Sequence, residues 1–346
     1  TYFFKDKTNY LILILITSSI ISLILREYPL FEALNLSRFF FGLPFIFLFL
    51  TPNLISKLKY PVVISFIIWN LIELIITFAT GEAPFYIRNF FMNEWGVSEA
   101  FKRSQFFGNT RLFGPVLNAS VNGSISACLL VASLFNKELI FGNLIISKLQ
   151  KKLVAIFSAI IFFLSASGTG TVTIIFLLAN KYIWPTFSGI TRNFRLKTFS
   201  LIFLLLAIAA ILPIIIFAPT WLSKLEFKYF SVIYEVKLED FLTFIDLNSI
   251  DAYLFGINYD PKALFLSDFV ILSLISSFGL IYLFFLLFIF QKIFQVQRIY
   301  FYALLISSLH YGTLFTVTGQ VLCSIIFSTK IVSTSSKKTR SFMAYK

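Results

Sequence analysis

The sequence predicts an all-α polytopic membrane protein with about ten transmembrane helices and both termini in the cytoplasm. Hydrophobic residues make up 58% of its 346 residues and charged residues only 13%, whereas a soluble domain has about 25% charged residues. The mean hydropathy is +0.87. The apolar residues form long runs instead of the strict alternation of membrane β-strands. This composition excludes a water-soluble globular protein.

Each expected transmembrane helix is an apolar run near the length of roughly 20 residues that crosses a bilayer. In chain order the runs are 9–25, 37–51, 61–80, 115–135, 153–166, 170–185, 198–218, 268–290, 295–310 and 313–329. The first run has no A-x-A-like cleavage site after it, so we expect a retained helix. The pairs at 153–185 and 295–329 are expected to be tight hairpins. No internal repeat is apparent, which favours a single transmembrane domain, 1–346.

The basic residues follow the positive-inside rule for this topology. Lys5 and Lys7 place the N-terminus in the cytoplasm. The cytoplasmic segments then hold 19 of the 29 basic residues but only two acids, Asp6 and Glu138, while the outer side keeps 10 basic residues and 13 acids. The even number of spans places the C-terminus in the cytoplasm too. Membrane topology, and not binding to nucleic acid, therefore explains the formal net charge of +13.

Two long polar segments fall on the outer side. Residues 81–114 form a basic loop and residues 219–267 form a large acidic loop. The charged residues of the acidic loop are Glu226, Glu235, Glu239, Asp240, Asp246, Asp251 and Asp260 against Lys224, Lys228, Lys237 and Lys262. Its segment 222–248 has apolar residues at helical spacing, which is typical of amphipathic helices on a membrane rim.

The basic loop is the main candidate for binding an anionic substrate. Its candidate cations are Arg88, Lys102, Arg103 and Arg111. The planar fork of arginine fits phosphate oxygens and stays charged when partly desolvated, so the group could neutralise a diphosphate at the bilayer surface. Lipid headgroups, or Glu94 and Glu99, are the alternative partners. The polar residues that follow, from Asn118 to Ser126, enter the membrane and are expected to face a cavity or a neighbouring helix.

Three residues are candidates for the base that deprotonates a sugar hydroxyl. We rank Asp268 first, His310 second and Asp260 third. Asp268 begins the span 268–290, where helix capping is the alternative role. His310 lies in an expected outer turn, and an aromatic-belt histidine is its alternative role. Lys262 follows Asp260 closely and could add a cation to the same cleft.

Glu73 is an acid within an apolar span. A buried carboxylate needs a partner, and Arg26 or Arg38 is the partner that the sequence suggests. A structural role is favoured over a catalytic one.

The remaining chemistry-bearing residues argue against metals and cofactors. Cys128 and Cys323 both lie in apolar runs, and His310 is the one histidine, so no zinc-ligand spacing exists. The sequence has neither a DxD pair nor a GxxxxGK[ST] phosphate loop. No metal and no cofactor are expected.

Three passages resemble the Wzy family of bacterial O-antigen and capsule repeat-unit polymerases, and more distantly the O-antigen ligases. Arg103 and Gly114 have the R-x10-G spacing of the polymerases' arginine loops. RLFGPVLNASVNGSISACLLV, from Arg111, resembles the passage before their central helix. LFGINYDPKALFLSDFVILSLISSFGLIYLFFLLF, from Leu254, resembles the end of their large periplasmic loop. The order of a long outer loop followed by three spans is similar as well.

The resemblance implies a GT-C-like glycosyltransferase of the bacterial inner membrane, with both outer loops in the periplasm. It would join repeat units carried on undecaprenyl diphosphate, without a metal, and a chain-length regulator is a further candidate partner. The ligases have a histidine-asparagine pair where this chain reads KALFLSD, which favours a polymerase. Residues 219–267 contain no arginine, so Lys262 or another lysine would replace the second arginine motif of some polymerases.

Two other functions remain open at this point. A transporter or flippase of lipid-linked oligosaccharide would also need an outer anion-binding surface, although such proteins often have symmetric repeats. An O-antigen ligase would transfer the glycan to lipid A core instead of to another repeat unit.

Overall fold

The computed structural model describes most of the helical framework. The described residues are 7–25, 29–89, 105–106, 109–141, 147–182, 254, 270–294, 298–308 and 313–327. Their regular structure is helical except for two short paired strands, β1 (Gln105–Phe106) and β2 (Asn109–Thr110), in which Gln105 pairs with Thr110. The all-α class expected from the sequence is therefore confirmed.

The described helices coincide with nine of the ten expected spans. In chain order the described helices are α1 (Lys7–Leu25), α2 (Leu30–Phe49), α3 (Pro52–Thr80), the 3-10 helix η2 (Gly114–Val116), α6 (Ala119–Phe135), α7 (Lys137–Phe141), α8 (Lys148–Ser165), α9 (Gly168–Tyr182), α16 (Val270–Ile293), α17 (Arg298–Ser307) and α18 (Val317–Ile326). The short helices η2 and α7 do not correspond to expected spans of their own. The expected span 198–218 lies outside the described residues. The two expected tight hairpins do not form as closely packed pairs: α8 and α9 both pack against α6 instead of against each other, and α17 packs against α9 while α18 packs against α2.

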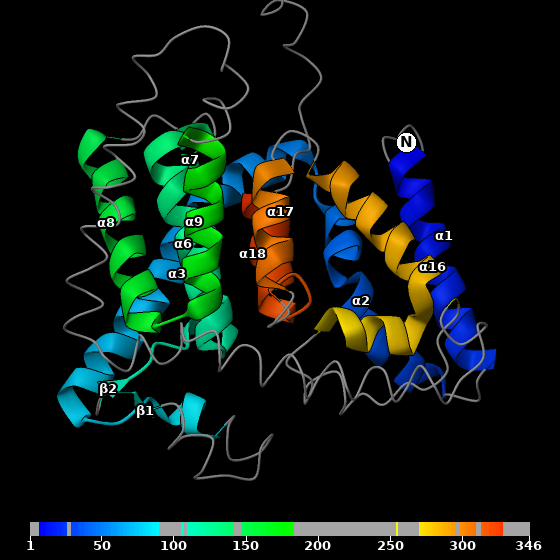
Figure 1. The fold of residues 1–346 in the computed structure, drawn as a ribbon, viewed down its shortest axis with the longest axis horizontal. Helices are drawn as coiled ribbons and strands as arrows, with labels where there is room; N and C mark the ends of the chain where they lie inside the picture. Colours follow the sequence, from blue (N-terminus) through cyan, green and yellow to red (C-terminus); the bar gives the residue numbers. More distant parts are fainter. Residues whose placement is uncertain are drawn as a thin grey trace, which may run out of the picture.

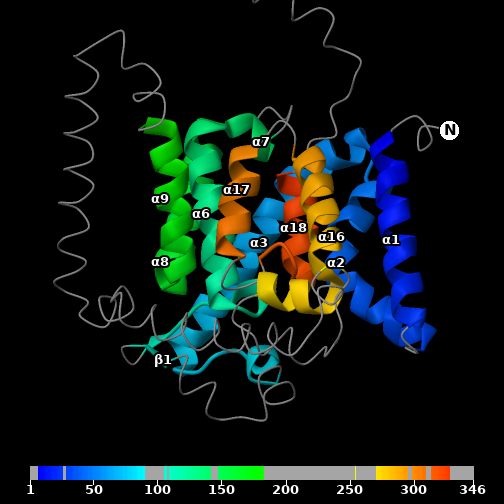
Figure 2. The same cartoon turned by 45° about the vertical axis from the view of Figure 1, so that its right-hand side comes forward.

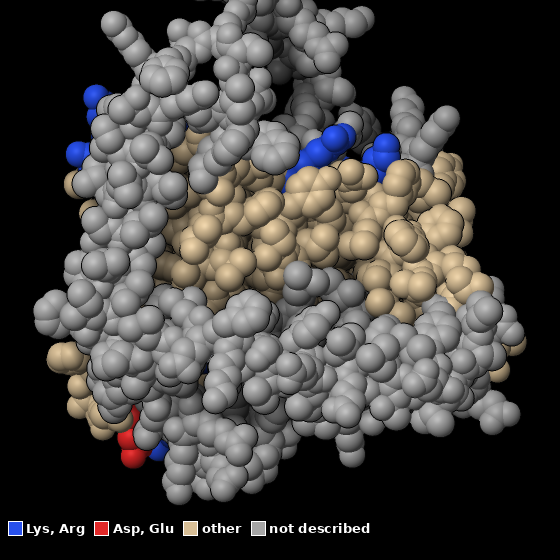
Figure 3. Space-filling view, viewed as in Figure 1, with Lys and Arg blue, Asp and Glu red and all other residues tan. Residues whose placement is uncertain are grey.

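The long helices run up and down between two ends of the molecule (Figures 1 and 2). We call one the loop end, because it carries residues 81–89, β1, β2 and η2. The other, the lysine-rich end, carries these described basic side chains: Lys57, Lys59, Lys137, Lys148, Lys151, Lys152, Lys181, Lys292 and Arg298. In Figure 3 the described surface is a broad band without charged side chains, and basic side chains lie along its upper edge.

One described helix, over Asn53–Thr80, is long and apolar enough to cross a membrane. Shorter apolar helices cover Asn9–Leu25, Ala119–Phe135, Phe278–Ile293, Arg298–Ser307 and Val317–Ile326. The structure thus supports the helical class more strongly than it supports the number of spans, which remains a prediction.

Several helices begin elsewhere than expected, and in α3 and α6 a capping residue sets the start. Helix α3 starts nine residues earlier than the expected span 61–80: the Thr51 side chain accepts a hydrogen bond from Leu54 N, and Pro52 occupies the first turn. Helix α6 starts at Ala119 instead of residue 115, because the Asn118 side chain accepts from Ser120 N and Val121 N.

The span expected at 268–290 is broken. Gly279 has φ 81° and ψ 169°, which is not helical. The part of α16 before Gly279 lies across the loop end, and the part after it runs toward the lysine-rich end (Figures 1 and 2). The break shortens the continuous apolar helix to Phe278–Ile293.

Helix α6 packs against α8, α9 and α17, and nearly all of its residues are buried. Small residues allow this close approach, as at many membrane helix interfaces. A Cβ on Gly170 of α9 would lie 2.9 Å from the carbonyl carbon of Gly123 in α6. The backbones of α6 and α9 are therefore nearly in contact.

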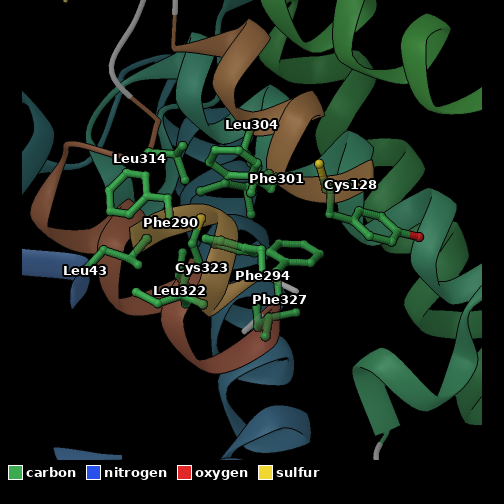
Figure 4. Close-up of a cluster of buried hydrophobic side chains, with 14 of the residues drawn as sticks. Leu43, Cys128, Phe290, Phe294, Phe301, Leu304, Leu314, Leu322, Cys323 and Phe327 are labelled. Atoms are coloured by element: carbon green, nitrogen blue, oxygen red, sulfur yellow. The ribbon is translucent and has the colours of Figure 1, made fainter. Parts of the chain in front are cut away.

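A larger apolar cluster joins α2, α6, α16, α17 and α18 (Figure 4). The rings of Phe294 and Phe301 stack at 5.6 Å between centroids, and Phe290 meets Phe301 edge-on at 6.3 Å. Cys128 and Cys323 belong to this cluster, and both are buried free thiols. The cluster holds the second half of the chain against the helices of the first half.

Candidate functional site

Glu73 in α3 is the buried acid around which the loop end is arranged. Its side chain is 1% exposed. Oε1 accepts a hydrogen bond from Phe113 N and Oε2 accepts one from Gly114 N, both at 2.7 Å. The sequence suggested Arg26 or Arg38 as the partner; those side chains lie outside the described part of the chain. Two adjacent backbone N–H groups instead donate to the two oxygens of the carboxyl group.

Gly114 fits this arrangement because it lacks a side chain. Its φ is 63°, in the left-handed region that other residues rarely adopt. A Cβ at this position would also lie 2.4 Å from Oδ1 of Asn122. The structure therefore gives a steric reason for the glycine of the R-x10-G spacing.

Asn122 in α6 connects three helices through its amide group. Nδ2 lies 2.7 Å from Oδ1 of Asn70 in α3, 3.1 Å from Oγ of Ser165 in α8, and 3.3 Å from the Leu112 carbonyl oxygen. Asn70, Asn122 and Ser165 are each 0% exposed. Together with Glu73 and the backbone of 112–114, these three residues form one buried polar cluster at the loop end.

Arg111 ties the end of the basic loop to the C-terminus of α8. Its Nε donates to the Ser165 carbonyl at 2.9 Å, and its Nη2 donates to the Ala166 carbonyl at 3.0 Å. Leu112 N donates to the carbonyl of Leu164 at 3.2 Å. Cations are favoured at a helix C-terminus, where carbonyl groups lack helical partners. The structure thus gives Arg111, a predicted diphosphate ligand, a helix-capping contact.

Arg88 lies on the other half of the basic loop, and the fold brings the two halves together. Residues 85–89 are helical, and Ile87 belongs to a buried cluster with Ala83, Phe113 and Ala119. The Nη1 of Arg88 pairs with Glu82, and the Arg88 side chain is 42% exposed. Its Nε is buried and has no acceptor among the described residues.

Tyr86 lies next to the carboxylate of Glu73. Its ring meets that of Trp69 in α3 edge-on, at 5.4 Å between centroids. Burial, and second the negative charge of Glu73, raise the pKa of the Tyr86 phenol to about 12. Tyr86 therefore remains a neutral phenol at physiological pH.

The other predicted site residues lie outside the described residues. These are Lys102, Arg103, Asp260, Lys262, Asp268 and His310. Described residues on either side of His310 are bonded to each other: the Ser307 hydroxyl donates to Oγ1 of Thr313 at 2.9 Å, and Leu314 N donates to the Ser308 hydroxyl. Helix α18, which follows, contacts η2 and α3.

Of the polar residues from Asn118 to Ser126, Asn122 and Ser124 bond to neighbouring helices, one of the two surroundings expected, whereas Asn118 caps its own helix. The Ser120 carbonyl lies within hydrogen-bond distance of the hydroxyls of Ser124, Ser167 and Thr169. Sequence reasoning did not single out Asn70 or Ser165. Asn70 lies three residues before Glu73, so both fall on one helix face, and this spacing of two polar residues in an apolar run was a usable signal.

No protein-family model, no curated protein and no solved structure matches this chain.

Proposed function

We propose that the chain is a membrane glycosyltransferase that polymerises undecaprenyl-diphosphate-linked oligosaccharide repeat units at its loop end. In this proposal the protein is a multi-pass protein of the bacterial inner membrane with about ten spans and a GT-C-like architecture. Both termini lie in the cytoplasm, and the loop end faces the periplasm.

The observation that carries the proposal is the environment of Arg88. Packing between Ile87 and Phe113 holds the segment that contains Arg88 against the end of the basic loop, which contains Arg111. The buried Nε of Arg88 has no acceptor among the described residues. A buried donor without an acceptor is costly, so a phosphate oxygen would be a favourable partner. The described lysines gather at the opposite end, which supports an outward orientation of Arg88 under the positive-inside rule.

The chemistry follows from the leaving group. The bond between the anomeric carbon and the diphosphate oxygen breaks, and a new bond forms to the acceptor hydroxyl oxygen. Arg88, Lys102 and Arg103 stabilise the charge that develops on the departing diphosphate. Asp268, His310 or Asp260, in that order of preference, takes the proton of the acceptor hydroxyl.

The test is a reconstituted polymerisation. Purified protein in vesicles, with a chelator present, is given undecaprenyl-diphosphate-linked repeat units, and products are separated by length. We expect products longer than one repeat unit and release of undecaprenyl diphosphate, and we expect Arg103→Ala to abolish both. Transfer to lipid A core alone would identify a ligase and overturn the proposal.

One observation favours a transporter as the second candidate. Transporters often use interrupted helices, and α16 is interrupted at Gly279. However, the segment before the break lies across the loop end in both views, not at mid-depth (Figures 1 and 2). Appearance of the unextended lipid-linked unit on the other side of the vesicle membrane would favour the transporter.

A further inference from the structure

We infer that Glu73 is a positioning residue for substrate binding: from inside the membrane domain, it holds the two described ends of the basic loop, 81–89 and 109–114, in place for the binding of a lipid-linked diphosphate. This inference deepens the proposed function and rests on it for the identity of the ligand. The first part of the inference, that Glu73 orders the loop, rests on the observed contacts alone and does not depend on the identity of the ligand.

The first step is the pair of hydrogen bonds to adjacent amides. Phe113 N and Gly114 N each donate to a different oxygen of Glu73 at 2.7 Å. A carboxylate has two acceptor oxygens, whereas a glutamine amide has one oxygen and an NH2 group that only donates. A glutamine at this position would therefore leave one buried N–H facing another donor. The arrangement specifically needs the acid.

The second step is what the two amides control. Phe113 lies two residues after Arg111, whose guanidinium caps α8. The Phe113 side chain packs in the same cluster as Ile87, the neighbour of Arg88. Fixing the peptide at 113–114 therefore fixes one described end of the basic loop and supports the other.

The third step is the depth of Glu73. Its side chain is 1% exposed, so it lies where it cannot touch a substrate at the surface. Burying a carboxyl group away from water is costly, and good hydrogen bonds must offset that cost. The two hydrogen bonds to the loop backbone offset this cost, so the buried position is consistent with a role in shaping the loop.

The experiment compares Glu73→Gln with the wild-type protein in two independent measurements. The first is the rate of trypsin cleavage within 81–114 in sealed vesicles whose loop end faces outward. The second is the Kd for undecaprenyl diphosphate, together with KM and kcat of polymerisation. We expect faster cleavage, a rise of about tenfold or more in Kd and KM, and a kcat changed by less than about threefold, because one buried charged hydrogen bond is lost.

Two further variants separate positioning from general damage. Glu73→Asp keeps two acceptor oxygens, so we expect values between those of the wild type and Glu73→Gln. Tyr300→Phe removes a buried hydroxyl that accepts from Asn136 Nδ2 at 3.2 Å, far from the loop in the chain. Because it also removes one hydrogen bond of a buried side chain, it is a matched control, and its Kd and cleavage rate should equal those of the wild type.

The outcomes distinguish this inference from the proposed function. Unchanged cleavage and unchanged Kd in a folded Glu73→Gln protein would overturn the inference. An equal effect of Tyr300→Phe would overturn it too, because the effect would then be general. If the wild-type protein does not bind undecaprenyl diphosphate at all, the proposed function fails, and the cleavage rate alone decides whether Glu73 orders the loop.

Discussion

Arg111 and Ser165 are 54 residues apart in the chain, yet the Arg111 Nε donates to the Ser165 carbonyl at 2.9 Å. The loop that enters α6 therefore begins where α8 ends. This contact packs the end of the basic loop against α8. It gives Arg111 a helix-capping role, whereas Arg88 is the proposed ligand of the diphosphate.

Arg111→Ala should reduce stability as well as polymer formation. The change removes two hydrogen bonds to the end of α8, each of which is worth about 1.5–3 kcal/mol when one partner is charged. We expect a lower midpoint of thermal unfolding in detergent for Arg111→Ala and an unchanged midpoint for Arg103→Ala. An unchanged midpoint for Arg111→Ala would contradict the capping role.

Arg88→Gln should weaken binding of undecaprenyl diphosphate by about tenfold, the loss expected for one charge-assisted hydrogen bond. Glu82→Gln is the matched control, because it removes the negative charge that pairs with the Arg88 Nη1 and leaves the guanidinium in place. This ion pair is partly exposed and therefore weak, so Glu82→Gln should retain or tighten binding. The measurement is the Kd for the lipid in detergent micelles; equal losses in both variants would refute the role of Arg88.

Gly114→Ala should destabilise the protein much more than Gly81→Ala. Both glycines have positive φ, 63° and 71°, so alanine is strained at either by about 1–2 kcal/mol. Only at Gly114 does the new Cβ also collide, 2.4 Å from Asn122 Oδ1, whereas nothing lies within 4 Å at Gly81. Thermal unfolding of both variants measures the difference, and equal midpoints would show that the collision is relieved without cost.

Asn70→Ala and Asn122→Ala should not have additive effects. The two side chains share a hydrogen bond of 2.7 Å between buried groups, and removing one partner leaves the other unsatisfied at a cost of about 1–3 kcal/mol. The double variant should be less destabilised than the sum of the two single variants. A double-mutant cycle of unfolding free energies tests this, and strict additivity would exclude the coupling.

Gly170→Ala should separate α6 from α9, whereas Gly168→Ala should be tolerated. The Cβ on Gly170 would meet backbone atoms of Gly123 at 2.9 and 3.0 Å, and nothing lies within 4 Å of a Cβ on Gly168. Overpacking of this kind costs about 1–3 kcal/mol. We expect a clear loss of thermal stability for Gly170→Ala alone. Comparable midpoints for the two variants would show that this interface is loose.

The helices were predictable because the signals that define them are local. Apolar runs placed nine described helices near their positions, but the caps Thr51 and Asn118, which set the starts of α3 and α6, were not predicted. The break at Gly279 was not predicted, because the apolar run continues through it. The candidate site was predicted only in part: the basic loop was recognised, but the partners of Glu73 and Arg111 are backbone atoms, which every residue carries and no sequence pattern marks.

The sequence by itself determined that this protein is helical and apolar and that its charges are unevenly distributed along the chain, because composition and local periodicity carry that information. Only the tertiary structure decided which groups meet at the loop end. Glu73 accepts from two amides forty residues away, and Arg111 reaches the end of α8, because helix packing brings these segments together. The same packing leaves the Arg88 Nε without an acceptor among the described residues.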